Sequence, residues 1–556
     1  MVDHDQSLSS LQVNMNKLLE EMKTINIKRL NNIDTVNFYR SLLSPIRLLP
    51  PELLGQIFLY AVQSHAPVRR GSPLSFTLVC SAWRQAALGC SYLWNELELS
   101  PGHPVHYGLN TLCPQRFSAF FSSWFRRANP AQPFRLSLNF DSTAPKLERE
   151  FANQLCRSVG SISPRLSELS IEFTHGTYNV LLPFLSNDSA DLAALEVLSL
   201  MDYSSTWRLE EVFPPVKVFG YAPRLCNVSL RIKENILVDS SSKFSPPWSQ
   251  LTTVDIRGTL SLGDFVLVIF QCPQLRVGYF MQVNIGDRIN DANIGQLSLP
   301  DTAMSLPCLV DFKLQFSGDL QLEPVDSTFV DVLRLIKLPV VERLNVASDP
   351  SCKVPLTPIF FNTLTEEAMH QTLRSLSLSN VDADLNELLD CVANCTVLEE
   401  LSLCMSGTPT TTILQNLLLF AQAPSHSSDE YPKPMSYLRV FRLAFLYIDN
   451  PDYMAIGLLF GQVVAALIKD SRRHRPLESA SLYVCDYHRS SLSQEQLESL
   501  TVAVESHVRD AEGGGAAASR GIDLEVKAFT SYSELSVTFD LLDLDEPLRR
   551  LSRLRN

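Results

Sequence analysis

The sequence predicts an α/β repeat fold, consisting of an N-terminal helix, a small all-helical unit, and an irregular solenoid with parallel strands on its concave face. Three observations predict it: a leucine-containing pattern that recurs to about residue 530, a compact apolar segment before it, and a long helical pattern before that segment. The expected boundaries are 1–44 for the helix, 45–100 for the helical unit, 101–535 for the solenoid and 536–556 for a C-terminal tail helix.

Length and charge narrow the class of protein. A chain of 556 residues is too long for one compact core unless its architecture is elongated or repetitive. Hydrophobic residues make up 45% and charged residues 19%, which is the composition of a folded protein. A net charge of −13 argues against binding to phosphate backbones, so we expect no nucleic-acid partner.

The 12 cysteines are scattered, and several lie in apolar runs, which predicts reduced, buried thiols and therefore the cytoplasm or the nucleus. Cys391 and Cys395 share a helix face, but no histidine or second cysteine pair lies near them at ligand spacing, so we expect core residues and no metal. The N-terminus lacks the features of a signal peptide, and the apolar stretch Gly457–Ile468, of 12 residues, is too short to span a membrane.

Residues 11–43 contain neither proline nor glycine and predict one helix, which the dipeptide Ser44-Pro45 ends. Alternating spacings of four and three indicate a coiled-coil seam of two heptads, interrupted at Arg29 and Asn32. The seam residues are Leu11, Met15, Leu18, Met22 and Ile25, followed after the interruption by Val36, Tyr39 and Leu43. Two interpretations remain open: self-association through residues 11–43, or packing of this helix on the next domain.

The apolar segment after this helix predicts two further helices. Pro50 is expected at the first helical position and Glu52 at the third, where a carboxylate meets the positive end of the helix. The apolar positions of the two helices are Leu53, Leu54, Ile57, Phe58 and Val62, and then Leu78, Val79, Ala82, Trp83, Ala86 and Ala87. A unit of about 50 residues can bury only part of this apolar surface internally. The remaining apolar surface therefore either binds a partner or docks on the repeats.

The repeating pattern is leucine, two residues, an apolar residue, one residue, and an apolar residue. Its copies start 24 to 40 residues apart, the spacing of one strand plus one helix or loop and the range of leucine-rich repeats and somewhat beyond. Copies begin at Leu166, Leu195, Leu225, Leu251, Leu275, Leu309, Val341, Leu373, Leu398, Leu438 and Leu477, and loosely at Trp94 and Pro133. One unit cannot bury its apolar face alone, whereas stacked units can.

The stretch Leu49–Leu99 resembles an F-box. The matching elements are "LPPELLGQIF" from Leu49, "VCSAW" from Val79, "LW" at Leu93 and "LEL" from Leu97. With the preceding "LLSPIR" and the upstream helix, the arrangement is similar to that of F-box-like proteins of mushroom-forming fungi, whose arms are leucine-rich. The loop from Ser64 to Pro73 is longer than in short F-boxes, which leaves the adjoining helix ends open.

The resemblance implies a substrate-recognition adaptor of an SCF-type (Skp–cullin–F-box) ubiquitin ligase. Such a protein docks on a Skp-type adaptor, which links it to a cullin–RING ligase, while the C-terminal arm selects a protein substrate. The residues implied to form or support the adaptor-binding face are Leu49, Pro50, Leu53, Leu54, Ile57, Phe58, Val79, Cys80, Trp83 and Trp94. A leucine-rich-repeat scaffold outside any ubiquitin ligase remains the alternative.

Alternation along each predicted strand places two rows of side chains on the concave face: the residue between the last two apolar positions, and the residue after the last one. The resulting surface is small and polar, with basic residues near its middle at Arg231, Arg257 and Lys313. We hypothesise that an acidic or phosphorylated segment of a substrate docks there, the alternative being solvated charges without a ligand.

An enzyme is the competing class. The sequence contains no nucleophile elbow, no glycine-rich loop ending in GK[ST] and no HExxH motif. We therefore expect no catalytic residues and no cofactor, and interpret "EGGGAAASRG" from Glu512 as a flexible loop.

Overall fold

The computed structural model describes residues 2–42, 45–63, 73–99, 114–140, 149–174, 191–202, 216, 218–232, 246–284, 304–317, 336–349, 354–356, 368–406, 410–422, 437–446, 453–471, 477–485, 494–512 and 522–529. The chain divides into two compact units. The first contains Met1–Leu97 and Ala119–Phe134, and the second contains Glu98–Ser118 and Arg135–Asn556.

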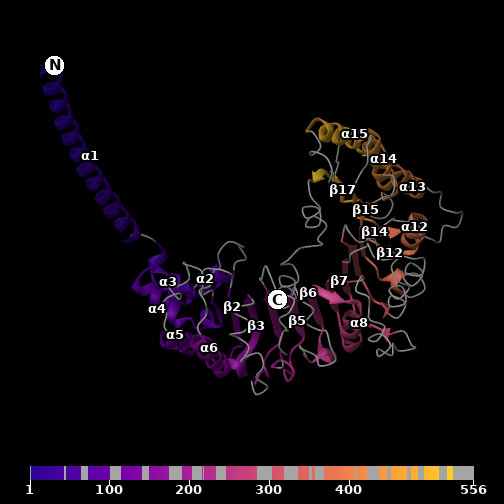
Figure 1. Ribbon diagram of the computed structural model, residues 1–556, viewed down its shortest axis with the longest axis horizontal. Helices are drawn as coiled ribbons and strands as arrows, with labels where there is room; N and C mark the ends of the chain where they lie inside the picture. Colours follow the sequence, from indigo (N-terminus) through magenta and orange to yellow (C-terminus); the bar gives the residue numbers. More distant parts are fainter. Residues whose placement is uncertain are drawn as a thin grey trace. The chain divides into compact units, whose positions relative to one another are not determined.

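The first unit is helical (Figure 1). Its long helix α1 confirms the helix predicted at 11–43 and begins earlier, at Val2; the predicted boundary at Ser44 lies outside the described residues. The elements in order are α1 (Val2–Leu42), η1 (Pro45–Leu48), α2 (Pro51–Gln63), α3 (Pro73–Thr77), α4 (Ser81–Gly89), η2 (Ser91–Trp94) and α5 (Pro114–Arg127).

The start of α2 differs by one residue from the prediction. The Leu54 amide donates to the Pro50 carbonyl at 3.1 Å, so Pro50 caps the helix and Pro51 is its first helical residue. Proline is tolerated at that position because its missing N–H would have no intrahelical acceptor. Glu52 remains in the first turn, near the positive end of the helix.

The second predicted helix is two helices, α3 and α4. Cys80 is extended, with φ −159° and ψ 173°, and this break starts a new helix at Ser81. Leu78 and Val79 lie in the intervening turn, where their amides donate to the carbonyls of Ser75 and Phe76. The prediction that both belong to a continuous helical face is therefore wrong.

Aromatic packing brings α5 into the first unit. The Trp94 indole N–H donates to the Ala87 carbonyl at 2.9 Å, and the Trp124 indole N–H donates to the Trp94 carbonyl at 3.0 Å. The two indole rings meet edge to face with centroids 4.7 Å apart. This unit therefore extends to residues 119–134, which the sequence pattern assigned to the solenoid.

The strands form a 14-stranded sheet, in the order β1-β2-β3-β4-β5-β6-β7-β9-β11-β13-β15-β16-β17-β18. From β3 to β18 every adjacent pair is parallel. The strands are β1 (Glu96–Leu99), β2 (Phe134–Asn139), β3 (Leu166–Phe173), β4 (Val197–Asp202), β5 (Asn227–Arg231), β6 (Thr253–Ser261), β7 (Val277–Asn284), β9 (Asp311–Ser317), β11 (Arg343–Ser348), β13 (Ser375–Ser379), β15 (Glu400–Ser406), β16 (Val440–Leu446), β17 (Ser479–Cys485) and β18 (Asp523–Phe529).

Every copy of the repeat pattern corresponds to a strand of this sheet, including the weak copies at Trp94, Pro133, Leu275, Val341 and Leu477. The first residue of each copy from Leu166 to Leu477 is buried, and the later apolar positions align across neighbouring strands, as Leu376 does with Leu401. The pattern missed β18, whose sequence has no leucine at the first position of the repeat. The second unit is therefore an α/β structure with a long parallel sheet.

Helices connect many of the strands. Figure 1 shows α8 and α12 to α15 on one side of the strand array. Ser261 caps α8 by accepting from the Asp264 amide at 3.1 Å, and Asp384 caps α12 by accepting from the Asn386 amide at 2.8 Å. The helices are α6 (Arg149–Ile162), η4 (Ser163–Arg165), η5 (Trp248–Gln250), α8 (Leu262–Gln271), η6 (Ala368–Gln371), α12 (Leu385–Asn394), α13 (Thr410–Gln422), α14 (Tyr453–Ser471) and α15 (Gln494–Glu512).

Two short parallel pairs accompany the main sheet. They are β8 (Met304–Ser305) with β10 (Ile336–Lys337), and β12 (Val354–Leu356) with β14 (Val381–Ala383). The predicted tail helix at 536–556, the loop 64–72 and the glycine-rich loop after Glu512 lie outside the described residues.

Candidate functional site

Helix α2 separates its apolar residues onto two faces. Leu54 and Phe58 are buried, whereas Leu53 and Ile57 expose 46% and 44% of their surface, with Tyr60 exposed beyond them. The spacing of four and three places Leu53, Ile57 and Tyr60 on one side of the helix. Burying large apolar side chains is favourable, so an exposed stripe of them is a candidate surface for a partner.

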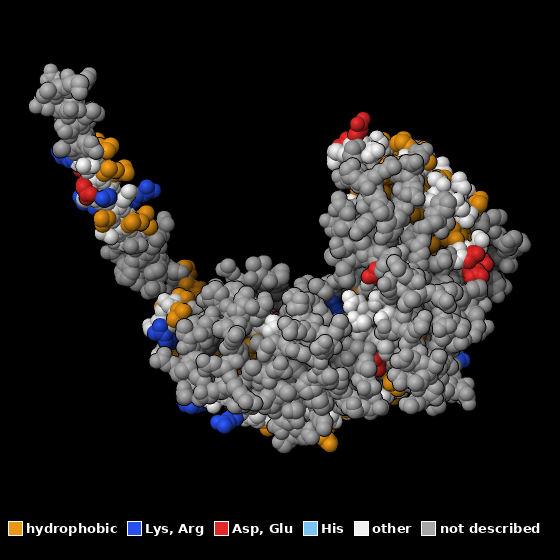
Figure 2. Space-filling view, viewed as in Figure 1, with side chains coloured by type: hydrophobic (Ala, Val, Ile, Leu, Met, Phe, Trp, Pro, Cys, Tyr) orange, Lys and Arg blue, Asp and Glu red, His pale blue; other side chains and the backbone are white. Residues whose placement is uncertain are grey.

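Neighbouring segments expose further apolar side chains. Leu78 and Val79 project from the turn between α3 and α4, and Leu48 ends η1. Figure 2 shows hydrophobic side chains, in orange, on this helical unit and along α1. We call the following exposed residues the candidate docking residues: Leu48, Leu53, Ile57, Tyr60, Leu78 and Val79.

The ten residues predicted for adaptor binding fall into three groups. Pro50, Leu53, Ile57 and Val79 are exposed; Leu49, Cys80 and Trp83 are half-buried; and Leu54, Phe58 and Trp94 are buried in the core. The buried three present no surface to a partner and support the fold instead. Leu48, Tyr60 and Leu78 are exposed but are not among the ten, although Leu78 was expected on the apolar face and Tyr60 follows Leu53 and Ile57 at helical spacing.

An aromatic cluster holds α2, α3 and α4 together beneath these residues. The rings of Phe58 and Phe76 stack with centroids 4.3 Å apart, and the Trp83 ring packs at 5.0 Å from that of Phe58. Such contacts add to the stabilisation from area burial alone. The exposed residues of α2 and of the α3–α4 turn are thus carried by elements fixed to one another.

Of the three basic residues predicted to face a substrate, Arg257 is paired with an acidic neighbour. The Arg257 side chain is 12% exposed, and its Nε donates to Asp255 Oδ1 at 2.9 Å. The Ser229 hydroxyl donates to the other oxygen of Asp255, at 3.3 Å. Arg257 is therefore held within the sheet, because a buried carboxylate and a buried guanidinium compensate each other's lost hydration.

Lys313 belongs to a second group centred on buried Asp311. Its ammonium lies 5.1 Å from the centroid of the Tyr279 ring, and the Tyr279 hydroxyl donates to Asp311 Oδ2 at 3.0 Å. Arg343 Nε donates to the same oxygen at 2.8 Å. Arg231, the third of the predicted residues, ends β5, and β5 pairs with β6, the strand that carries Asp255 and Arg257.

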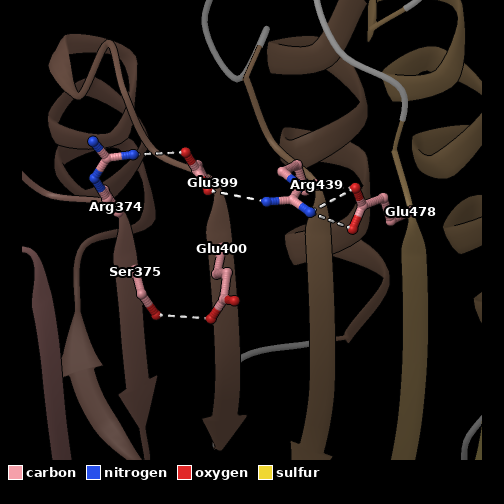
Figure 3. A network of polar contacts seen from close by, with 6 residues as sticks. All are labelled: Arg374, Ser375, Glu399, Glu400, Arg439 and Glu478. Atoms are coloured by element: carbon pink, nitrogen blue, oxygen red, sulfur yellow. Dashed lines mark hydrogen bonds and ion pairs between the residues drawn. The ribbon is translucent and has the colours of Figure 1, made fainter. Parts of the chain in front are cut away.

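A ladder of alternating charge runs across the starts of four strands (Figure 3). Glu399 accepts from Arg374 at 2.8 Å and from Arg439 at 3.4 Å, and Arg439 reaches both oxygens of Glu478. The hydrogen bonds to Glu478 are the main reason that the pKa of Arg439 is raised. A sequence signal existed, since each of these residues directly follows the first leucine of its repeat.

This ladder is best explained as part of the sheet. The backbone amides of Glu399, Arg439 and Glu478 each donate to the carbonyl of the preceding member at 2.7 to 2.8 Å. Arg374, Glu399, Arg439 and Glu478 each have an opposite charge beside them, whereas Glu400 in the same view accepts from the Ser375 hydroxyl (Figure 3). The ion pairs of the ladder are largely exposed, so salt screens them and they add little to stability. Their main effect is to favour one register between neighbouring strands.

The contact between Tyr483 and Glu525 predicts a pH dependence. The Tyr483 hydroxyl donates to Glu525 Oε2 at 2.5 Å, and burial, followed by this hydrogen bond, raises the pKa of Tyr483 to about 12. Between the ordinary value of about 10 and about 12, the unfolded chain releases a proton that the folded chain keeps. Stability should therefore fall as pH rises through this window. In urea unfolding at several pH values, the free energy of unfolding of Tyr483→Phe should fall less steeply with pH than that of the wild type. Tyr92→Phe, at an exposed tyrosine, is the control and should keep the wild-type slope.

The cysteine pair at the end of α12 lies in the core. Cys391 and Cys395 are both buried, and their mutual hydrogen bond, followed by burial, raises the pKa of the Cys391 thiol above its usual range. Across the described ranges, no group of three or more histidine, cysteine, aspartate or glutamate residues could hold a metal ion. Nor is any helix within those ranges long and apolar enough to cross a membrane.

These features define a class: a helical unit with exposed apolar residues, and an α/β unit built on a long parallel sheet. No family model matches the chain, and no curated protein matches it. The functional assignment therefore rests on the residues and their geometry.

Proposed function

We propose that this protein is the substrate-recognition adaptor of an SCF-type ubiquitin ligase. In this proposal, residues 45–100 act as an F-box that binds a Skp-type adaptor, and the parallel-sheet unit selects the protein substrate. The protein performs no chemistry itself, and ubiquitin transfer belongs to the cullin–RING ligase. The setting is the cytoplasm, the nucleus or both.

The exposure pattern of α2 is the observation that supports the proposal most. An amphipathic helix with one buried face needs polar residues on the other if it faces only solvent. Here the outward face carries Leu53, Ile57 and Tyr60. Recognition by a partner through a helix face of this kind is driven by apolar burial, which fits the role that the F-box resemblance implies.

The parallel-sheet unit supports the second half of the proposal less specifically. A long sheet built from stacked repeats offers an extended surface suited to proteins rather than to small molecules. Lys313 and the partly exposed Arg343 lie on the neighbouring strands β9 and β11 and suit an acidic segment of a substrate, whereas Arg257 is held by Asp255.

We expect the double substitution Leu53→Ala with Ile57→Ala to weaken binding to a Skp-type adaptor about a hundredfold and to abolish co-purification. Both side chains are about half exposed, so their truncation should leave thermal unfolding of the chain nearly unchanged. Calorimetric titration with purified adaptor, together with a thermal melt, measures both quantities.

The matched control is Leu419→Ala with Met454→Ala, which removes exposed apolar side chains of similar size from α13 and α14. This control should bind the adaptor like the wild type. Full binding by the Leu53/Ile57 double variant would exclude the F-box assignment. A chain that binds the adaptor but supports no ubiquitin transfer with adaptor, cullin and E2 would favour a scaffold outside the ligase.

A further inference from the structure

Helix α1 presents apolar side chains along much of its length. The helix has 41 residues, and each of its described side chains, at 14–33, 35 and 36, is exposed. The exposed large apolar residues are Met15, Leu18, Leu19, Met22, Ile25, Ile27, Leu30, Ile33 and Val36. Most helices in proteins are stabilised by packing of an apolar face, so a helix of this composition requires a partner.

Most of these apolar residues follow a heptad seam that Arg29 and Asn32 interrupt, while Ile27 and Leu30 lie away from it. When Met15, Met22 and Val36 occupy the first position of a heptad (a), Leu18 and Ile25 occupy the fourth (d). Leu19 and Ile33 then fall at e, directly beside the seam, and widen it. Arg29 and Asn32 are the polar members of the same seam.

We propose that α1 pairs with α1 of a second copy of this chain as an antiparallel two-stranded coiled coil. The two-fold axis passes between Lys23 and Thr24, close to the middle of the helix. In this register, Met22 of each copy packs against Ile25 of the other. The two helices then overlap over nearly their whole length, about 60 Å at 1.5 Å per residue.

The charges beside the seam select this register. Glu21 and Lys28 occupy the g positions, and the antiparallel arrangement places Glu21 of each copy opposite Lys28 of the other, forming two equivalent ion pairs. Within the part of the chain that the structure describes, neither side chain forms an ion pair of its own. By contrast, Glu20 and Lys23 already pair with each other at 2.7 Å, away from the seam.

The other arrangements bring like charges together. A shift of one heptad in either direction places Glu21 opposite Glu21, or Lys28 opposite Lys28. A parallel pairing in register places Arg29 against Arg29 inside the seam, and leaves Glu21 and Lys28 facing Asn26 and Ile33. Like-charged neighbours on paired helices are destabilising, and so the antiparallel register is favoured.

Sedimentation equilibrium of the full chain tests the dimer. The wild type should sediment with twice the 62.3 kDa mass of one chain. Ile25→Asp should weaken dimerisation at least about a hundredfold, because the dimer would bury two carboxylates in the seam. Ile27→Asp is the matched control: Ile25 and Ile27 are 64% and 59% exposed, but Ile27 lies at f, away from the seam. A monomeric wild type, or equal effects of the two variants, would overturn the proposal.

Charge reversal tests orientation and register in the same assay. Glu21→Lys and Lys28→Glu should each weaken the dimer about tenfold, because each makes both ion pairs repulsive. The double variant Glu21→Lys with Lys28→Glu should regain wild-type affinity, and an equal mixture of the two single variants should form a heterodimer. Single variants that dimerise like the wild type, or a double variant that stays weakened, would exclude the antiparallel register.

Discussion

Trp94→Ala should unfold the helical unit at conditions where the wild type is folded, with a loss of about 4 kcal/mol in the free energy of unfolding. Trp94 is fully buried, meets Trp124 edge to face, and lies beneath the Arg127 guanidinium, 5.0 Å from its ring centroid. Removing the indole leaves a large cavity and leaves the Ala87 carbonyl without the hydrogen bond that Trp94 donates to it. So large a loss is a substantial part of the stability of a typical domain.

Urea unfolding followed by tryptophan fluorescence measures this loss, because Trp83 and Trp124 remain as probes in the same unit. Tyr92→Ala is the control, since Tyr92 is exposed and its truncation should change stability by less than about 0.5 kcal/mol. If Trp94→Ala lost adaptor binding while keeping wild-type stability, Trp94 would be a contact residue and not part of the core.

Gly258→Ala should destabilise the parallel-sheet unit by about 3 kcal/mol or more. A Cβ atom on Gly258 would lie 1.7 Å from the carbonyl oxygen of Ile232 and 2.8 Å from its carbonyl carbon. These are backbone atoms of the segment that follows β5, so relief requires the two segments to separate. Glycine in a strand marks such close approaches of another backbone.

Thermal unfolding of the second unit measures the effect, and Gly160→Ala in α6 is its matched control. A Cβ on Gly160 meets nothing within 4 Å, so this helical substitution should stabilise the chain by about 0.5 to 1 kcal/mol. Equal melting temperatures for Gly258→Ala and Gly160→Ala would show that β6 can move away from Ile232 at little cost in free energy.

The strands of the second unit were predictable because their signal is local. The first residue of each repeat is buried, and alternation then fixes which following residues share a row. Ser377, Ser402 and Arg442 each stand between the last two apolar positions of their repeats, and they are aligned partners on β13, β15 and β16. The pattern missed β18 because its apolar residues Leu524 and Val526, which align with Ala480 and Leu482, follow no leading leucine.

The candidate docking residues were predictable only in part. Leu53 and Leu54 are adjacent and chemically identical, and helical periodicity alone does not tell which of them faces the core. The packing of Phe58, Phe76 and Trp83 decides it, since Leu54 lies on the same side of α2 as Phe58. The same limit explains why Phe58 and Trp94 were grouped with contact residues.

By itself, the sequence determined the strands of the main sheet from β1 to β17, their buried rows and the heptad spacing in α1, because these depend on spacings within one segment. The tertiary structure alone decided which apolar residues stay exposed, that α5 joins the helical unit through Trp124, and that Asp255 and Asp311 pair with Arg257 and Arg343. Each of these depends on side chains about 30 residues apart or on neighbouring strands, and such distances in space are set by packing rather than by periodicity.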